Sequence, residues 1–211
     1  TVINWSEEAR NFYKRDKVAR ITPEYLWYKE GITWGLISGT SNSFRILPEG
    51  MTFNCAGPTV FMKNETELPF VLGILNSKMA QFLLKQFNET INLTIDDISN
   101  IPFVDNNKDL ISKLVKQNIN ISKDDWDSFE TSWDFTKHPL LKPMSKVSTI
   151  RDSIANWNTY TYQQRSLLKN NEEELNKIFI DIYGLNDELT PVVDDKDITI
   201  RKEDKVRDIK S

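Results

Sequence analysis

Residues 67–87 read ELPFVLGILNSKMAQFLLKQF and form the clearest helical pattern in the first half of the chain. Apolar side chains recur in this stretch three and four residues apart, which is the spacing of one helix face. Pro69 falls in the first turn, where a missing N–H is tolerated. The stretch therefore predicts one amphipathic helix, whose core-facing side consists of Leu68, Val71, Leu72, Leu75, Met79, Phe82, Leu83 and Phe87.

The sequence on both sides of this helix has the alternation of short strands. Upstream, turn-forming residues separate stretches rich in strand formers, and downstream residues 90–95 return to a period of two. Strands around a packed helix are typical of an α/β (α+β) fold with a small mixed sheet. We expect the upstream strands at residues 32–37, 44–47, 51–55 and 59–62.

A second, much longer helix is predicted in the other half of the chain. Residues 148–183 contain neither proline nor glycine, and Gly184 follows where a helix normally ends. At about 1.5 Å per residue such a helix spans ~50 Å, which suits a spacer. Polar residues Thr161, Gln164 and Asn171 interrupt its apolar repeat, so a coiled coil and packing on another domain both remain open.

Between these parts the pattern is weaker. A helical stripe covers residues 109–121, and Ser122 with Asp125 has the spacing of a capping box for a second short helix to Phe129. The chain as a whole divides into a basic linker, an αβ domain, a helical and irregular connector, the long helix and an acidic end, which we place at residues 1–24, 25–105, 106–147, 148–184 and 185–211.

The composition indicates a globular protein of a reducing compartment. Hydrophobic residues make up 39% of the chain and aromatic residues 11%, which is enough for a core. The single Cys55 excludes an internal disulfide, so we expect a cytoplasmic location. No apolar run is long enough for a membrane span, and no signal peptide is present. Because the chain starts at Thr1 without methionine and stops in a helical pattern, we expect a piece of a longer protein.

Charge is unevenly distributed along the chain. The net charge is −4, and the excess of acid lies after residue 170, where twelve Asp and Glu face seven Lys and Arg. The densest cationic cluster faces only Asp16 and consists of Arg10, Lys14, Arg15, Lys17 and Arg20. Such a cluster serves phosphate contacts in nucleic-acid-binding proteins, and an ordinary solvated surface explains it equally well.

Residues with catalytic or metal-binding chemistry are sparse. With one histidine, His138, and one cysteine, zinc sites and Ser-His or Cys-His pairs lack their parts. The glycines at 31, 35 and 39 are not followed by the Lys-Ser/Thr of a phosphate-binding loop, so we attribute them to turns and bulges. The clustered carboxylates lie in solvated helical runs. We predict no catalytic and no metal-binding residue in this chain.

Several strings resemble PglX-type adenine-specific DNA methyltransferases. YKEGITW at 28–34 and LPEG at 47–50 are similar to the region after the catalytic domain of that family. LGILNSKMA at 72–80 resembles its leucine-asparagine-serine-lysine helix, which also occurs in target recognition domains of Type I and Type IIG restriction-modification proteins. DWDSFETSWDF at 125–135 and IFIDIYGL at 178–185 resemble the PglX branch, so the resemblance covers residues 25–211.

The resemblance implies a full-length protein that transfers a methyl group from S-adenosylmethionine to adenine N6 within a phage-defence system of the BREX kind. The family's donor-binding and catalytic motifs lie upstream of this region, and the eight prolines here all stand alone, so an Asn-Pro-Pro-Tyr motif is absent. We therefore expect no enzyme activity and no cofactor in this chain itself. The expected partners are double-stranded DNA, the protein's own methyltransferase domain and other defence proteins, without a membrane.

On this hypothesis the chain is the DNA sequence-recognition region of the enzyme. Polar and cationic loop residues would contact base edges, and we select Ser38, Thr40, Ser41, Asn42, Ser43, Arg45, Lys63 and Asn64. The cationic cluster from Arg10 to Arg20 would contact phosphates. The alternative explanation of the first group is a plain hairpin connection, and that of Lys63-Asn64 is helix N-capping. The alternative function is a protein-docking module over residues 100–211; a nuclease half is disfavoured because its acidic-lysine pattern is missing.

Overall fold

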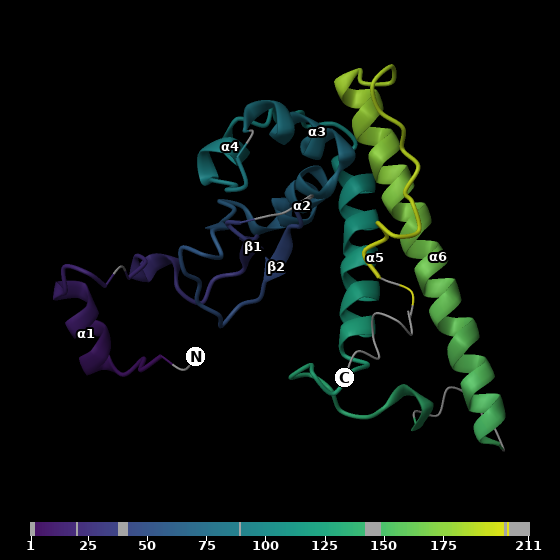
Figure 1. Ribbon diagram of the computed structural model, residues 1–211, viewed down its shortest axis with the longest axis horizontal. Coiled ribbons are helices and arrows are strands. Elements are labelled where there is room, and N and C mark those ends of the chain that lie inside the picture. Colours follow the sequence, from purple (N-terminus) through teal and green to yellow (C-terminus); the bar gives the residue numbers. More distant parts are fainter. Residues whose placement is uncertain are drawn as a thin grey trace. The chain divides into compact units, whose positions relative to one another are not determined.

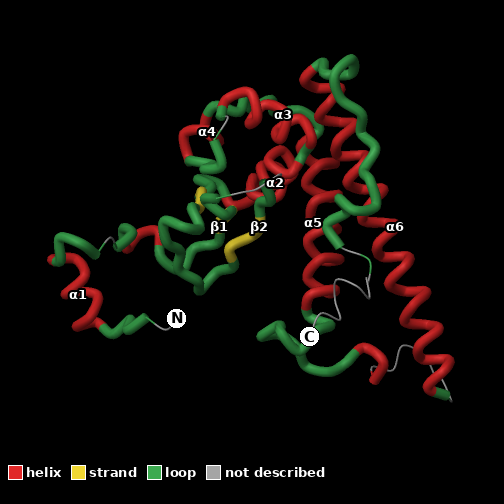
Figure 2. Tube along the Cα trace, viewed as in Figure 1, coloured by secondary structure: helices red, strands yellow, loops and turns green. Residues whose placement is uncertain are grey.

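The computed structural model describes residues 3–19, 21–37, 42–88, 90–141, 149–200 and 202. The chain forms two compact units: residues 1–68 with 81–102, and residues 69–80 with 103–211. The two units show which residues pack together. The expected domain limits at residues 24, 105, 147 and 184 stay predictions. The mixed α/β class is confirmed by a small sheet and several helices (Figure 2).

The first unit is built around a three-stranded antiparallel sheet with the order β2-β1-β3. Its strands are β1 (Gly31–Thr33), β2 (Arg45–Leu47) and β3 (Thr59–Val60) (Figure 1). Ile32 stands at its centre, fully buried, opposite Ile46 and Val60. A Cβ on Gly31 would lie 2.8 Å from the carbonyl oxygen of Val60, so only glycine lets β1 approach β3 this closely.

The strand predictions need correction in four respects. The sheet is antiparallel throughout and not mixed, and its strands are shorter than the alternation indicates. Residues 51–55 form no strand. Met51 ends a turn that begins at Pro48, and the backbone groups of Gly50 and Met51 bond those of Tyr28. Residues 90–95 contribute one isolated bridge, Ile37 to Asn92, in place of a strand. The N–H groups of Thr90, Asn92 and Thr94 bond nearby side chains, and that of Leu93 bonds the carbonyl oxygen of Leu36. Alternation of residue types does not encode such bonds.

Short helices complete the first unit. Helix α1 (Glu7–Arg15) is followed by the 3-10 turn η1 (Glu24–Leu26), and α4 (Ile95–Ser99) follows the bridge at Asn92. A capping box between Thr94 and Asp97 starts α4, and Asn88 also donates to Asp97 at 2.8 Å. Burial raises the pKa of Asp97, but the bonds from Thr94 and Asn88 outweigh burial and lower the pKa overall.

The helix predicted over residues 67–87 is two helices. After the 3-10 turn η2 (Glu65–Glu67), α2 (Leu68–Asn76) and α3 (Lys78–Phe87) are separated at Ser77. The Ser77 hydroxyl donates to the carbonyl oxygen of Ile74 at 2.6 Å and accepts from the N–H of Ala80 at 3.2 Å. It thus ends one helix and caps the next, a competition with backbone bonding that is typical of serine.

Two long antiparallel helices form the frame of the second unit. These are α5 (Lys108–Trp126) and α6 (Ile150–Tyr183), joined in part by the 3-10 turn η3 (Pro139–Leu141) (Figure 1). The prediction of α6 is confirmed, with Thr149 as its N-cap and Gly184 at φ 66° as its C-cap. The expected new helix at Ser122 is wrong, because α5 continues without interruption to Trp126.

Helix α6 contributes buried residues to the core between Leu168 and Ile180. Leu168, Leu175 and Phe179 are buried, and so is Asn171, whose amide donates to the side-chain oxygens of Gln117 at 2.9 Å and Asn118 at 2.8 Å. The polar interruption at residue 171 is therefore satisfied by α5, and the helix packs within its own unit. The expected role of this helix as a spacer between domains stays a prediction.

Close packing against α5 also explains one glycine of α2. A Cβ on Gly73 would lie 2.8 Å from a methyl of Val115 and 3.2 Å from one of Ile111. Both neighbours are β-branched and stiff in a helix, so they cannot yield cheaply. None of the described helices is long and apolar enough to cross a membrane.

Candidate nucleic-acid interface

The cationic residues of α1 divide into two groups. Arg10 donates to the carbonyl oxygen of Trp5 at 2.6 Å and lies 6.0 Å from the ring centre of Trp27. Lys14 forms an ion pair with Glu24. Both side chains therefore hold α1 against the η1 segment. The positive charge of Arg10 lies near the Trp27 ring, and that of Lys14 is paired with Glu24.

Two other cations of this cluster face solvent. Arg15 and Lys17 are exposed, with Arg15 bonded through Nε to the carbonyl oxygen of Asn11 at 3.1 Å. Arg20 lies outside the described residues. Acidic Glu7 and Glu8 in the first turn and Lys14 and Arg15 in the last match the helix dipole. The end of α1 thus carries positive charge that a phosphate can reach.

Aromatic packing fixes the position of α1 within the first unit. The indole N–H of Trp5 donates to the hydroxyl of Tyr28 at 2.6 Å, and the rings of Trp5 and Trp27 have centroids 5.0 Å apart. Trp27 is itself buried, and its N–H donates to the carbonyl oxygen of Thr22 at 2.9 Å. The cationic helix is consequently anchored to the body that carries the sheet.

The predicted base-reading loop is described only in its second part. Ser38, Thr40 and Ser41 lie outside the described residues. The backbone of Asn42 is held by Gln81, with two hydrogen bonds of 3.1 Å each. Ser43 is exposed, and buried Phe44 packs on Trp34 with ring centroids 5.7 Å apart. This anchor fixes the backbone from which the next residue projects.

Arg45 is that residue, and it is exposed at the start of β2. It stands opposite Thr33, which in turn stands opposite Thr59, so Arg45 occupies an edge-strand position in a defined register. A guanidinium offers donors in a fixed fork that matches the acceptors of guanine. The structure therefore brings Ser43 and Arg45 together on one ordered stretch.

The second predicted pair has a structural role in part. The Asn64 side-chain oxygen accepts from the N–H of Thr66 at 3.2 Å and from its hydroxyl at 2.9 Å, so Asn64 caps the turn before α2. Lys63 is exposed beside it. N-capping thus accounts for the Asn64 oxygen, while the Lys63 ammonium faces solvent.

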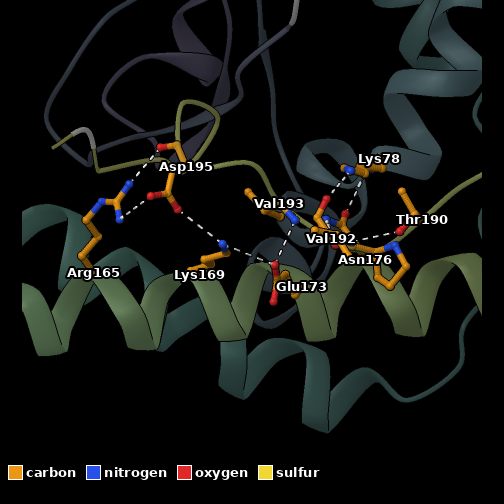
Figure 3. Close-up of polar contacts among 10 residues, drawn as sticks. Lys78, Arg165, Lys169, Glu173, Asn176, Thr190, Val192, Val193 and Asp195 are labelled. Carbon is orange, nitrogen blue, oxygen red and sulfur yellow. Dashed lines mark hydrogen bonds and ion pairs between the residues drawn. The ribbon is translucent and has the colours of Figure 1, made fainter.

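A polar cluster in the second unit was not predicted from the sequence. The backbone N–H of Lys78 donates to the side-chain oxygen of Asn176 at 2.9 Å, and the Lys78 ammonium donates to the carbonyl oxygen of Val192 at 2.5 Å (Figure 3). Asn176 is buried on α6 and also donates to the carbonyl oxygen of Pro191 at 3.4 Å. The only hint in the sequence is an asparagine within the apolar end of α6.

The same cluster continues along α6 and binds residues 189–200, here called the return segment. The N–H of Val193 donates to Glu173 at 3.0 Å, and Asp195 pairs with Lys169 at 3.4 Å and Arg165 at 3.8 Å (Figure 3). Burial raises the pKa of Glu172, although the N–H of Thr199 bonds its carboxylate. The return segment, which belongs to the expected acidic end, is therefore packed on α6, and Val193 and Ile198 are buried with Ile121 and Leu168.

The exposed residues of the first unit offer hydrogen-bond donors, acceptors and positive charge. No group of three or more His, Cys, Asp or Glu side chains that could hold a metal ion occurs in the described part of the chain. What these residues can do chemically is bind an anionic, hydrogen-bonding surface.

Comparison with known proteins gives two relatives, while no family model matches the chain. The chain is 34% identical over 219 residues to the adenine-specific methyltransferase PglX of Lacticaseibacillus casei (strain Zhang), which covers all of this chain and 18% of that protein. It is 32% identical over 191 residues to the adenine-specific methyltransferase BrxX of Escherichia coli O9:H4 (strain HS), which covers 90% of this chain and 15% of that protein. The chain thus spans less than a fifth of either relative.

This chain has a mixed α/β fold and an exposed cationic helix, and it is similar along its length to these two proteins. It is therefore related to a segment of adenine-specific methyltransferases. The particular relatives are of the PglX and BrxX type, so the resemblance stated from the sequence is confirmed.

Proposed function

We propose that this chain is the DNA sequence-recognition region of a site-specific adenine-N6 DNA methyltransferase in a phage-defence or restriction-modification system. The observation that carries this proposal is the match of the whole chain to a part of an adenine-specific methyltransferase. An adenine must leave the duplex stack before it is methylated, and some module must select which adenine that is. S-adenosylmethionine would be bound by another part of the enzyme.

The exposed residues of the first unit suit this role in two ways. Ser43, Arg45 and Lys63 would contact base edges in the major groove, where serine suits several bases and Arg or Lys suits guanine. Arg15 and Lys17 would contact phosphates, which position the protein without reading sequence. The anchors at Phe44 and Trp27 favour the proposal, because reading requires side chains on a rigid scaffold.

Replacing Arg45 by alanine in the full-length enzyme is expected to lower the rate of methylation at the native site. A bidentate contact to a base is worth about 1–3 kcal/mol of discrimination, which corresponds to about 5–150-fold. Binding of S-adenosylmethionine should not change. The measurement is methyl transfer to duplexes with the native site and with a substituted site. Lys85→Ala, which removes another exposed cation of the same unit, is the matched control. If Arg45→Ala methylates both duplexes at the unchanged rate, Arg45 does not contact the base edges.

A salt titration separates DNA recognition from the alternative, a docking module with little DNA contact. Phosphate contacts make the logarithm of the binding constant fall linearly with the logarithm of salt concentration, by about 0.9 per contact. We expect a steep slope for duplex binding by the enzyme and a slope shallower by about 0.9 for Lys17→Ala. The specificity ratio between sites should stay the same in that variant. A slope near zero for the unchanged protein would favour docking.

A further inference from the structure

A compact series of turns follows α5 and belongs to the second unit. We call residues 126–135 the aromatic turn. The backbone N–H of Ser128 donates to the carbonyl oxygen of Asp125 at 3.1 Å, and that of Ser132 donates to the carbonyl oxygen of Phe129 at 3.0 Å. Both serines are buried, and the Ser132 hydroxyl donates to the Asp127 carboxylate at 2.6 Å. The backbone of the aromatic turn is therefore held by buried polar contacts.

This ordered backbone presents large aromatic side chains to solvent. Trp126 is 58% exposed, Phe129 57% and Trp133 92%. Phe129 also lines a shallow hollow of about 200 Å³ together with Ser128, Glu130, His138, Pro139 and Trp157. Exposed aromatic groups on a fixed backbone are characteristic of interaction sites, because their burial releases much apolar surface from water at little cost in entropy.

The charge around the aromatic turn is negative. The turn carries Asp127, Glu130 and Asp134, and the end of α5 just before it carries Asp124 and Asp125. Lys123 bonds both Asp127 and Asp134 at 2.6 Å, so it is occupied within the turn. Among the residues whose placement is described, Asp124, Asp125 and Glu130 have no cationic partner. Burial also raises the pKa of Asp125, as expected for a half-buried carboxyl without such a partner.

Aromatic rings beside carboxylates without a cationic partner form a surface that is complementary to an arginine side chain. An arginine has an apolar stem that fits an apolar hollow, and its guanidinium both stacks on indole rings and bonds carboxylates. A phosphate backbone would be repelled by the same carboxylates. We propose that the aromatic turn, with Trp157 of α6, docks an arginine-bearing segment of a partner protein. None of these residues is among those proposed to contact DNA.

The test uses the full chain and a blocked hexa-arginine peptide as the probe, with hexa-lysine as the comparison. Binding is measured by calorimetry, and the indole N–H signals are followed by NMR. We expect hexa-arginine to bind more tightly than hexa-lysine and to shift the Trp133 and Trp126 signals. Trp133→Ala and Glu130→Gln should each weaken hexa-arginine binding by about tenfold, in the range of a partly desolvated cation–π contact or charged hydrogen bond.

Matched controls are Tyr162→Ala, which removes another exposed ring, and Glu174→Gln, which removes another exposed carboxylate. Neither should change hexa-arginine binding. Circular dichroism should confirm that each variant keeps its fold, as expected from the exposure of Trp133. Equal affinity for both peptides, with no loss in Trp133→Ala, would mean attraction by net charge alone and would overturn the proposal. Shifts of the same indoles by a short DNA duplex, with none by hexa-arginine, would overturn it as well.

Discussion

Exchanging residues 25–68 and 81–102 for the matching residues of a relative that marks another site is expected to move methylation to the relative's site. These residues contain the proposed base-reading positions, including Ser43, Arg45 and Lys63. Each wrong base pair costs about 1–3 kcal/mol, so several changed contacts together give a discrimination of several orders of magnitude. The measurement is sequencing of methylated adenines in DNA from cells that carry the hybrid enzyme.

The limits of this exchange follow from the structure. Residues 69–80 pack with the second unit, where Gly73 faces Val115 and Ile111 and the N–H of Lys78 bonds Asn176. A hybrid that replaced them would lose these contacts and destabilise the protein for a reason unrelated to DNA. Keeping the host's residues 69–80 therefore restricts the exchange to the first unit.

A second hybrid provides the control. Exchange of residues 1–24 replaces Arg15 and Lys17, which are proposed to contact phosphates. Since phosphate contacts carry no sequence information, this hybrid should keep the original site and change only the salt dependence of binding. If the first hybrid is folded and active but still modifies the original site, recognition by this chain is wrong.

Replacing Phe179 by alanine is expected to lower the free energy of unfolding by about 3–5 kcal/mol, the range for a buried phenylalanine that leaves a cavity. Phe179 is 1% exposed on α6, and its ring lies 3.8 Å from a Cβ placed on Gly73. The stiff residues Ile111 and Val115 also line this contact, so little collapse into the cavity is possible. The measurement is urea unfolding followed by circular dichroism.

Tyr162→Ala on the same helix is the matched control, because Tyr162 is 73% exposed. Its effect should stay within about 0.5 kcal/mol. If the two compact units unfold in separate transitions, the loss in Phe179→Ala should fall on one of them, and each transition is fitted by itself. Equal stability of the two variants would show that α6 does not form the core described above.

Features of the site followed from the sequence to different extents. Asn64 was selected as a base-contacting residue, with N-capping as the alternative, and the structure shows the cap, which depends on residues two and three positions away. The contacts of Arg10 with Trp27 and of Lys14 with Glu24 were not predicted, since they depend on how separate segments meet. Sequence thus identified a cationic cluster, and tertiary structure decided which of its charges face solvent. The role of these residues in binding DNA stays a prediction.

The sequence by itself determined the α/β class and the limits of the longest helix. No proline or glycine interrupts α6, Thr149 caps its start and Gly184 ends it, and all of these signals act within one helical turn. Only the tertiary structure decided the break at Ser77, the short strands and the packing of the return segment on α6. The N–H of Lys78 bonds Asn176, 98 residues away along the chain, and Asp195 pairs with Lys169. Hydrogen bonds and ion pairs between distant segments form only when those segments are brought together, so no local pattern predicts them.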